Sequence, residues 1–389
     1  LFNHLDTATC DQLLAELRKL CETEIAESFA DADRLGVHFD GEGNVTLPES
    51  LKRSMDAFWA GGWHLLNLPI DMGGGGAPPT LAWAAHEFAL GANPAVSFYC
   101  FGNVVAHTIE RLGTPAQKAR FVRPMIDRNW GGTMVLTEPS AGSDVGAGRT
   151  KATHVEGDVW EIEGVKRFIS QGDFDAVENI VHLVLARPEG GQAGTKGLSM
   201  FIVPKFWVND DGSLGERNGA FCTNVEKKMG LKASATCEMT FGDRMPCRGL
   251  LVGEVPEGIR QMFHVIEYAR MAIGVKATST LSTGYLNALA YAKERVQGPD
   301  LTKAADKSSP RVRIIEHPDV RRMLMLQKSW AEGMRAMYFY TAHLQDKVEI
   351  AGGHGHPEAQ RLDRLNDLML PILKGVFSET CYELLSHSL

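Results

Sequence analysis

The spacing of apolar residues changes twice along this chain of 389 residues, and the change limits the folds that the chain can adopt. From Thr9 to about Ile126 apolar side chains recur every three or four residues, which predicts helices. Short runs with strand character follow, and the helical spacing returns after Leu251. The sequence therefore predicts an α+β protein, mainly α, with three domains. They are a helical domain at 1–132, a barrel-like β domain at 133–250 and a C-terminal helical bundle at 251–389.

Local signals predict where individual elements begin and end. Thr114-Pro115-Ala116-Gln117 has the form of a capping box with proline at the first helical position, and Thr9-x-x-Gln12 has the same form. Apolar spacing predicts one long helix over His317–Gln345, and two polar stretches, 297–313 and 347–364, are expected to be surface insertions. The predicted strands are Thr133–Leu136, Val159–Ile162, Ile180–Ala186, Leu198–Val203 and Glu238–Phe241.

Charge and cysteine usage exclude several classes of protein. The net charge is −8 without a long basic block, which argues against a nucleic-acid partner. No apolar run is long enough for a transmembrane segment, and no histidine has a second ligand at the spacing of a metal site. Seven cysteines form no C-x-x-C pair, so we expect reduced thiols and a cytoplasmic location.

The run from Met134 to Val145 joins a strand-like segment to a tight turn that is rich in hydroxyl groups. Its threonine, serines, glycine and proline expose backbone N–H groups and hydroxyls that suit a ring with carbonyl and imide groups. On composition alone a simple surface turn is the better explanation of the run.

Two further motifs make the pattern specific. Leu136-Thr137-Glu138-Pro139-Ser140-Ala141-Gly142-Ser143-Asp144 is followed by Thr150-Lys151-Ala152 and then by Gly164-Val165-Lys166-Arg167-Phe168-Ile169-Ser170. In order and spacing these motifs resemble those of the acyl-CoA dehydrogenases, and most closely the bacterial long-chain members with extra C-terminal sequence. The resemblance implies an acyl-CoA dehydrogenase-like fold and a bound FAD.

The resemblance also implies roles for individual residues. In the family the first motif bonds the pyrimidine end of the flavin, the aromatic residue of the last motif shields the ring, and the hydroxyl after it lies near the flavin nitrogen that accepts hydride. Ser143 would also contact the acyl-CoA, although a turn hydroxyl bonded to Asp144 is the alternative. Strand periodicity alone would instead bury Phe168 in the core. The implied cofactor-binding residues are Leu136, Thr137, Gly142, Ser143, Phe168, Ile169, Ser170 and Arg295.

Three residues of the C-terminal part complete the implied site. Glu267 and Arg270 match substrate-side positions of the family, and an exposed ion pair on a helix is the alternative explanation. Arg295, in a partial match to an E-R-x-x-x-G element, would reach the FAD of a neighbouring subunit. In the nearby Glu316-His317-Pro318, proline replaces the glutamine usual in the family, which puts that cofactor contact in doubt.

The implied reaction is oxidation of a fatty acyl-CoA to the trans-2-enoyl-CoA in fatty-acid β-oxidation or other lipid metabolism. The resemblance also implies an electron-transfer flavoprotein as the electron acceptor and a homodimer or homotetramer as the assembly. The catalytic base stays unassigned: Ala269 occupies one position that the family uses, and the usual glutamate is expected beyond Leu389, in a C-terminal bundle that we therefore expect to be incomplete. An acyl-CoA oxidase-like flavoenzyme and a flavin-binding protein without turnover are the alternatives.

Overall fold

The computed structural model describes residues 2–303 and 305–389, which form two compact units. The first unit comprises Pro78–Gly91 and Ala269–Leu389, with the N-terminal residues up to Leu14, and the second comprises Ala15–Ala77 and Ala92–Tyr268. This grouping reflects compactness and cuts across the element types, so the three-domain division made from the sequence stays a prediction.

The second unit begins with helices whose ends follow from local capping. The Thr114 hydroxyl accepts the Gln117 N–H at 3.2 Å and the Gln117 side chain accepts the Thr114 N–H at 3.1 Å, which confirms the predicted capping box. The box predicted at Thr9 is wrong, because the first helix begins two residues earlier and the Asp6 carboxylate accepts the Thr9 N–H at 2.8 Å. The helices are α1 Thr7–Leu20, which begins in the first unit and is continued by the π-helical turn Cys21–Ile25, then α2 Ala26–Leu35, α3 Glu49–Ala60, α5 Pro94–Tyr99, α6 Gly102–Leu112 and α7 Pro115–Asp127.

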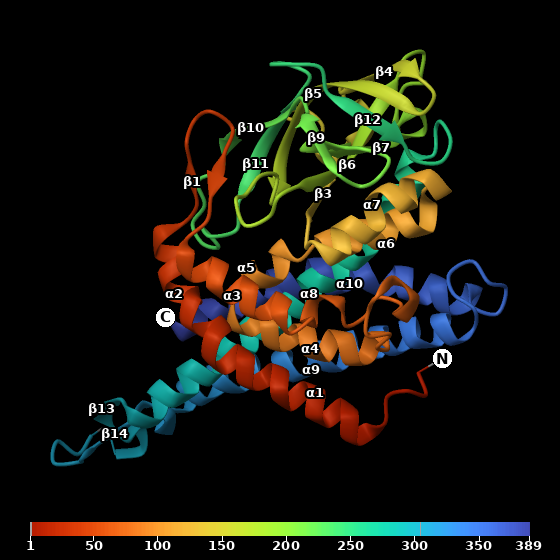
Figure 1. Cartoon of the computed structure of the whole chain (residues 1–389). Helices are drawn as coiled ribbons and strands as arrows, with labels where there is room; N and C mark the ends of the chain where they lie inside the picture. The colour runs from red at the N-terminus through yellow and green to blue at the C-terminus, as the bar shows by residue number, and fades with distance from the viewer. Residues whose placement is uncertain (1, 304) are drawn as a thin grey trace. The chain divides into compact units, whose positions relative to one another are not determined.

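The central strands close into a barrel (Figure 1). Pairing runs from β5 to β12, β7, β6 and β4 and back to β5, while β11 and β10 extend the sheet from β5 and β3 extends it from β6. The strands are β3 Gly131–Val135, β4 Lys151–Glu156, β5 Val159–Ser170, β6 Ile180–Pro188, β7 Ser199–Pro204, β10 Ala220–Val225, β11 Thr236–Phe241 and β12 Arg248–Leu251. Two small hairpins add β1 His38–Phe39 with β2 Val45–Thr46, and β8 Phe206–Val208 with β9 Leu214–Arg217.

Alternating side chains of β6 separate two hydrophobic cores. Val181, Leu183 and Leu185 pack with residues of α6 and α7, whereas Val184 and Ala186 face the barrel interior. Strands buried on both sides read as continuous apolar runs, which is why the sequence predicted β6 and β7 well. The sequence missed β4, β10 and β12, which mix polar with apolar residues, and it predicted only the first third of β5.

The first unit is a set of long helices (Figure 1). A buried cluster joins α4 to α9: the Arg335 guanidinium donates to both Glu87 oxygens, at 2.9 and 3.1 Å from Nε, and the Tyr338 hydroxyl donates to the same carboxylate. Arg335 also donates to Ser282 of α8 at 3.2 Å. The helices are α4 Pro79–Ala92, α8 Gly258–Glu294, which continues from the second unit, α9 Pro318–Ile350 and α10 Gln360–Leu385.

The two predicted insertions lie at the ends of α9. Residues 297–313 include a hairpin of β13 Val296–Pro299 and β14 Arg311–Arg313, a structure that the sequence did not predict; Ala304 lies outside the described residues. The second stretch is shorter than predicted, because α9 continues to Ile350 and α10 begins at Gln360. Among the helices described, none combines the length and apolar character needed to cross a membrane.

Candidate flavin and acyl-CoA site

A β-bulge turns Phe168 out of the sheet. Between β5 and β11 the register shifts, so that Cys237 pairs with Ile169 and Met239 with Lys166, which leaves one extra residue on β5. Phe168 adopts a positive φ of 60°, a conformation that bulky residues rarely take, and its side chain is 57% exposed. The alternative that strand periodicity buries Phe168 in the core is therefore wrong, because the bulge breaks the alternation.

A buried ion pair joins the bulge to the hydroxyl-rich turn. Lys166 Nζ donates to Glu138 Oε1 at 2.9 Å and to the Leu136 carbonyl at 2.9 Å, and both charged side chains are at least 94% buried. The Arg167 N–H donates to the Thr137 carbonyl at 2.8 Å. The carbonyls of Leu136 and Thr137 are thus fixed against β5, and the two motifs that were recognised separately in the sequence form one structural unit.

Two more donors complete the environment of Glu138. Its carboxylate accepts the backbone N–H groups of Arg149 at 2.6 Å and Thr150 at 3.1 Å, so it also anchors the segment after the turn. Burial raises the pKa of the Glu138 carboxyl, but the charge of Lys166 and the bond from Arg149 outweigh that effect and the net pKa is lowered. Burial lowers the pKa of Lys166, and the Glu138 charge only partly offsets it.

Three hydroxyl groups of the predicted site lack a hydrogen-bond partner in the part of the chain that the structure describes. Among the described residues, no hydrogen bond is formed by the side-chain hydroxyl of Thr137, Ser143 or Ser170, so the alternative in which Ser143 bonds Asp144 is not observed. A Cβ atom added at Gly142 would meet only Thr137 Cγ2, at 3.9 Å. The space beside Thr137 is therefore open to a ligand.

Leu136 and Ile169 can reach a ligand only through their backbones. Ile169 is 2% exposed and packs in the barrel interior, and the Leu136 side chain packs against the core beneath α6 and α7. Their side chains fix the position of the backbone, while the neighbouring Phe168 ring and the hydroxyls remain accessible. This division between buried anchors and exposed polar groups suits a flat ring with hydrogen-bonding edges.

The remaining predicted residues lie on and after α8. Glu267 and Arg270 are half-buried and three residues apart on this helix, which passes from the second unit to the first between Tyr268 and Ala269. Arg295 directly follows α8 in the first unit and its side chain is exposed. His317 Nε2 lies 2.7 Å from the Gln297 carbonyl, and Pro318 is the first residue of α9. The replacement of glutamine by proline thus has a structural role as a helix start.

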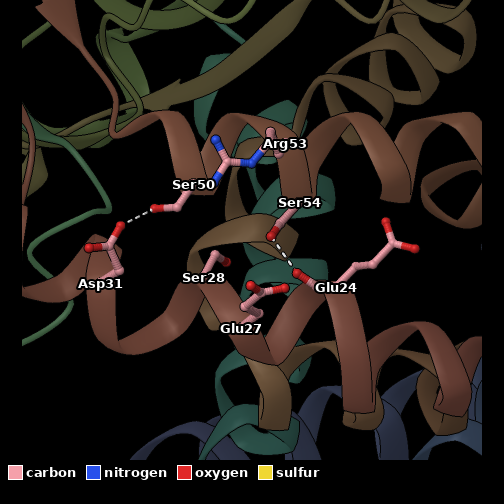
Figure 2. Close-up of a pocket in the computed structure, with 7 residues that line it drawn as sticks. All are labelled: Glu24, Glu27, Ser28, Asp31, Ser50, Arg53 and Ser54. Atoms are coloured by element: carbon pink, nitrogen blue, oxygen red, sulfur yellow. Dashed lines mark hydrogen bonds between the residues drawn. The ribbon is translucent and has the colours of Figure 1, made fainter.

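A second hollow of the second unit differs in character (Figure 2). It has a volume of about 310 Å³ and lies between α2, with the π-helical turn before it, and α3. Its lining is polar: Ser50 Oγ donates to Asp31 at 2.6 Å and Ser54 Oγ donates to the Glu24 carbonyl at 2.7 Å. Glu24, Glu27 and Asp31 line it with Arg53, and this excess of carboxylates disfavours the phosphate groups of FAD or CoA.

Family models match both parts of the chain that contain these features. The model described as the N-terminal domain of acyl-CoA dehydrogenase matches residues 7–129, and the model of the middle domain matches residues 133–244, which include the turn and the bulge. The chain belongs to the acyl-CoA dehydrogenase family. Members of this family are FAD flavoproteins.

Individual relatives agree with this assignment. Broad-specificity linear acyl-CoA dehydrogenase FadE5 of Mycobacterium tuberculosis is 54% identical over all of this chain, and 3-methylmercaptopropionyl-CoA dehydrogenase of Ruegeria pomeroyi is 36% identical over 96% of it. The chain spans 64% and 62% of the lengths of these relatives. The structure of butyryl-CoA dehydrogenase from Megasphaera elsdenii superposes on this chain with a TM-score of 0.70 at 19% sequence identity. The match covers 98% of this chain and 88% of the butyryl-CoA dehydrogenase chain, and it confirms the predicted fold.

Sequence reasoning named the motifs but missed the roles of Glu138 and Lys166. Both stand inside the recognised motifs, and their charges are opposite, yet 27 residues separate them in the chain. A lysine at a buried position requires a nearby acid, but Lys166 stands beside Arg167, so the local sequence gave no clear signal of its burial.

Proposed function

We propose that this chain provides the flavin and thioester site of an FAD-dependent dehydrogenase that converts a fatty acyl-CoA to its trans-2-enoyl-CoA. The observation that carries the proposal is the bulge, which presents the Phe168 ring beside the clamped turn of Thr137 and Ser143. The named activities of relatives support it, since they are acyl-CoA dehydrogenases. A role in fatty-acid or other lipid metabolism follows from this substrate class.

The residues present fit FAD. The unpartnered hydroxyls of Thr137, Ser143 and Ser170 supply hydrogen-bonding groups, Phe168 supplies an aromatic face, and the open space at Gly142 leaves room for the ring. When bound, FAD accepts the hydride that leaves the β carbon of the acyl chain. The chain's own residues hold the ring edge, cover one of its faces and position the thioester close to Ser143.

Proton removal from the α carbon needs a base that the residues described do not identify. Ala269 has no carboxylate, and we do not assign this role to Glu267. In the proposal Arg270 and Glu267 act on the substrate side, where an arginine orients a carboxylate through charge-assisted hydrogen bonds. Arg295, exposed after α8, is proposed to contact FAD held by a neighbouring subunit, which requires a homodimer or homotetramer.

Two further proposals concern the electron acceptor and the location of the protein in the cell. We expect an electron-transfer flavoprotein to accept the electrons. We also expect a cytoplasmic location, because all seven cysteines are free and six of them are buried, as in proteins of reducing compartments.

Absorbance measurements on the purified protein test the proposal. The protein should bind FAD, and anaerobic addition of a saturated acyl-CoA should bleach the flavin band near its long-wavelength maximum. A panel of acyl-CoA lengths gives the substrate range, for which we expect long or broad specificity; a sharp optimum at four carbons would contradict this. Failure of every chain length to bleach a stoichiometrically loaded protein would exclude dehydrogenation, and rapid peroxide formation would favour the oxidase alternative.

A further inference from the structure

Met229 is an apolar side chain that the fold leaves in solvent. Its side chain is 88% exposed, more than that of any other large apolar residue described except the C-terminal Leu389. It lies at the tip of a loop between β10 and β11, residues 226–235, which we call the Met229 loop. Single exposed apolar residues are common on protein surfaces, so a role for Met229 has to be argued from the loop around it.

The Met229 loop is held firmly at its base. The Tyr99 hydroxyl donates to the Ala233 carbonyl at 2.9 Å and accepts the Ala235 N–H at 2.8 Å. The Lys232 N–H donates to Asp33 at 2.7 Å, and Lys228 Nζ donates to the Ser234 carbonyl at 2.6 Å. These contacts hold the loop on both sides of Met229, which reduces the entropy that the loop would lose on binding.

Charge around the tip is positive in a protein whose net charge is negative. Three lysines surround Met229, and no carboxylate occurs between residues 227 and 237, whereas the whole chain carries a net charge of −8. Lys227 and Lys232 are exposed, and Asp33 is the acidic residue bonded at the base of the loop. A methionine flanked in sequence by exposed lysines complements a partner surface that has an apolar spot with an acidic rim.

The Met229 loop is continuous with Phe168. Glu226, at the start of the loop, accepts from Arg167 Nε at 2.9 Å, and the Arg167 guanidinium lies 5.2 Å from the centre of the Phe168 ring. Met229 follows Glu226 by three residues, a separation of at most about 11 Å along the chain. A protein interface of ordinary size covers roughly 800 Å² per partner, about 30 Å across, and can therefore include both side chains.

We propose that Phe168 and the Met229 loop form the docking surface for a protein electron acceptor with an acidic rim. The inference rests on the proposed function, in which Phe168 covers the flavin. For each acyl-CoA oxidised, two electrons leave beside Phe168 and reduce one two-electron acceptor or two one-electron acceptors. Met229 provides the apolar anchor, and Lys227 and Lys232 attract the acidic rim.

The test compares two acceptors for the FAD-loaded protein: purified electron-transfer flavoprotein and ferrocenium, a small ion that needs no docking surface. Met229→Asp should raise the apparent KM for electron-transfer flavoprotein roughly tenfold, the loss expected for an interface anchor. Its turnover with ferrocenium and its flavin bleaching by acyl-CoA should equal those of the wild type. Met245→Asp is the matched control, because Met245 is also an exposed methionine of the second unit but lies in another loop.

A charge variant tests the basic rim separately. The double substitution Lys227→Glu with Lys232→Glu should raise the same KM at low salt and remove most of its dependence on ionic strength. Equal KM values for Met229→Asp, Met245→Asp and wild type would overturn the proposal. A change from oligomer to monomer in Met229→Asp, measured by analytical ultracentrifugation, would also overturn it and would assign the loop to contact with a second copy.

Direct binding separates this inference from the proposed function. Titration of the FAD-loaded protein with oxidised electron-transfer flavoprotein, followed by calorimetry, requires no acyl-CoA turnover. Absence of bleaching in the wild type would refute the dehydrogenase function, while loss of binding in Met229→Asp would still support the docking surface. Normal bleaching together with unchanged binding in the variant would refute the docking surface alone.

Discussion

Replacing Lys166 by methionine should destabilise the protein far more than a typical surface substitution does. Lys166 donates two hydrogen bonds of 2.9 Å, to Glu138 and to the Leu136 carbonyl, and is 98% buried. Lys166→Met leaves a buried carboxylate without its counter-charge, although the N–H groups of Arg149 and Thr150 still bond it. Removal of one partner from a buried ion pair typically costs 3–5 kcal/mol, and the two remaining bonds place our expectation near the lower end, about 3 kcal/mol.

A double-mutant cycle measures how much of this cost belongs to the pair. Urea unfolding at pH 7 gives the free energies of Lys166→Met, Glu138→Gln and the double variant. Since the double variant contains no unpaired charge, its loss should be smaller than the sum of the single losses by about 1–3 kcal/mol. Lys151→Met, at an exposed position of β4, is the control and should stay within about 0.5 kcal/mol of the wild type.

The same variants test whether the ion pair positions the turn. At a temperature where Lys166→Met remains folded, its affinity for FAD should fall at least about tenfold, because the Leu136 carbonyl loses its anchor. Strict additivity of the two single losses, together with wild-type FAD affinity, would refute the reasoning and would show that the turn keeps its shape without the pair.

Three further changes have expected outcomes that separate stability from binding. Gly142→Ala should leave the unfolding free energy unchanged or raise it by up to about 1 kcal/mol, since the Cβ meets open space, yet weaken FAD binding in a fluorescence titration; equal affinity would contradict an open ring site. Phe168→Gly removes an exposed side chain at positive φ, so stability should stay within about 1 kcal/mol of wild type while FAD affinity drops; a large loss of stability would show that Phe168 serves packing. Burial lowers the pKa of His64 to about 4 and that of His182 to about 3, so each group favours the folded state above pH 6.5 and loses that contribution as pH falls toward its folded pKa. As the pH falls from 6.5 to 4, each histidine should lower the unfolding free energy by up to about 1.4 kcal/mol per pH unit. In urea unfolding, the unfolding free energy of His182→Gln should therefore fall less steeply with decreasing pH than that of the wild type. Identical slopes in the two proteins would refute the assignment.

Local physical signals in the sequence were sufficient for several elements. The capping box at Thr114 and the long helix α9 depend on residues within a few positions of one another, so their stereochemistry can be read directly. The recognised motifs likewise placed Thr137, Ser143 and Phe168 in one candidate site. Their roles in binding FAD and substrate remain predictions.

Only the tertiary structure decided how these segments meet. The sequence predicted a barrel-like domain, but β4, which closes the ring between β5 and β6, has an alternating polar pattern that does not distinguish it from a loop. The exposure of Phe168 depends on one extra residue opposite β11, and a bulge of this kind is defined by pairing with a partner strand nearly 70 residues away.

The ion pair between Lys166 and Glu138 is the clearest feature that the sequence alone could not predict. The sequence determined that an acid and a lysine stand in two motifs, and with them the chemical groups available to the site. Whether the two charges lie in water or bury each other depends on the strand pairing that brings Lys166 under the turn. Long-range pairing is set by the sum of many weak contacts across the whole unit, and no short stretch of sequence contains that sum.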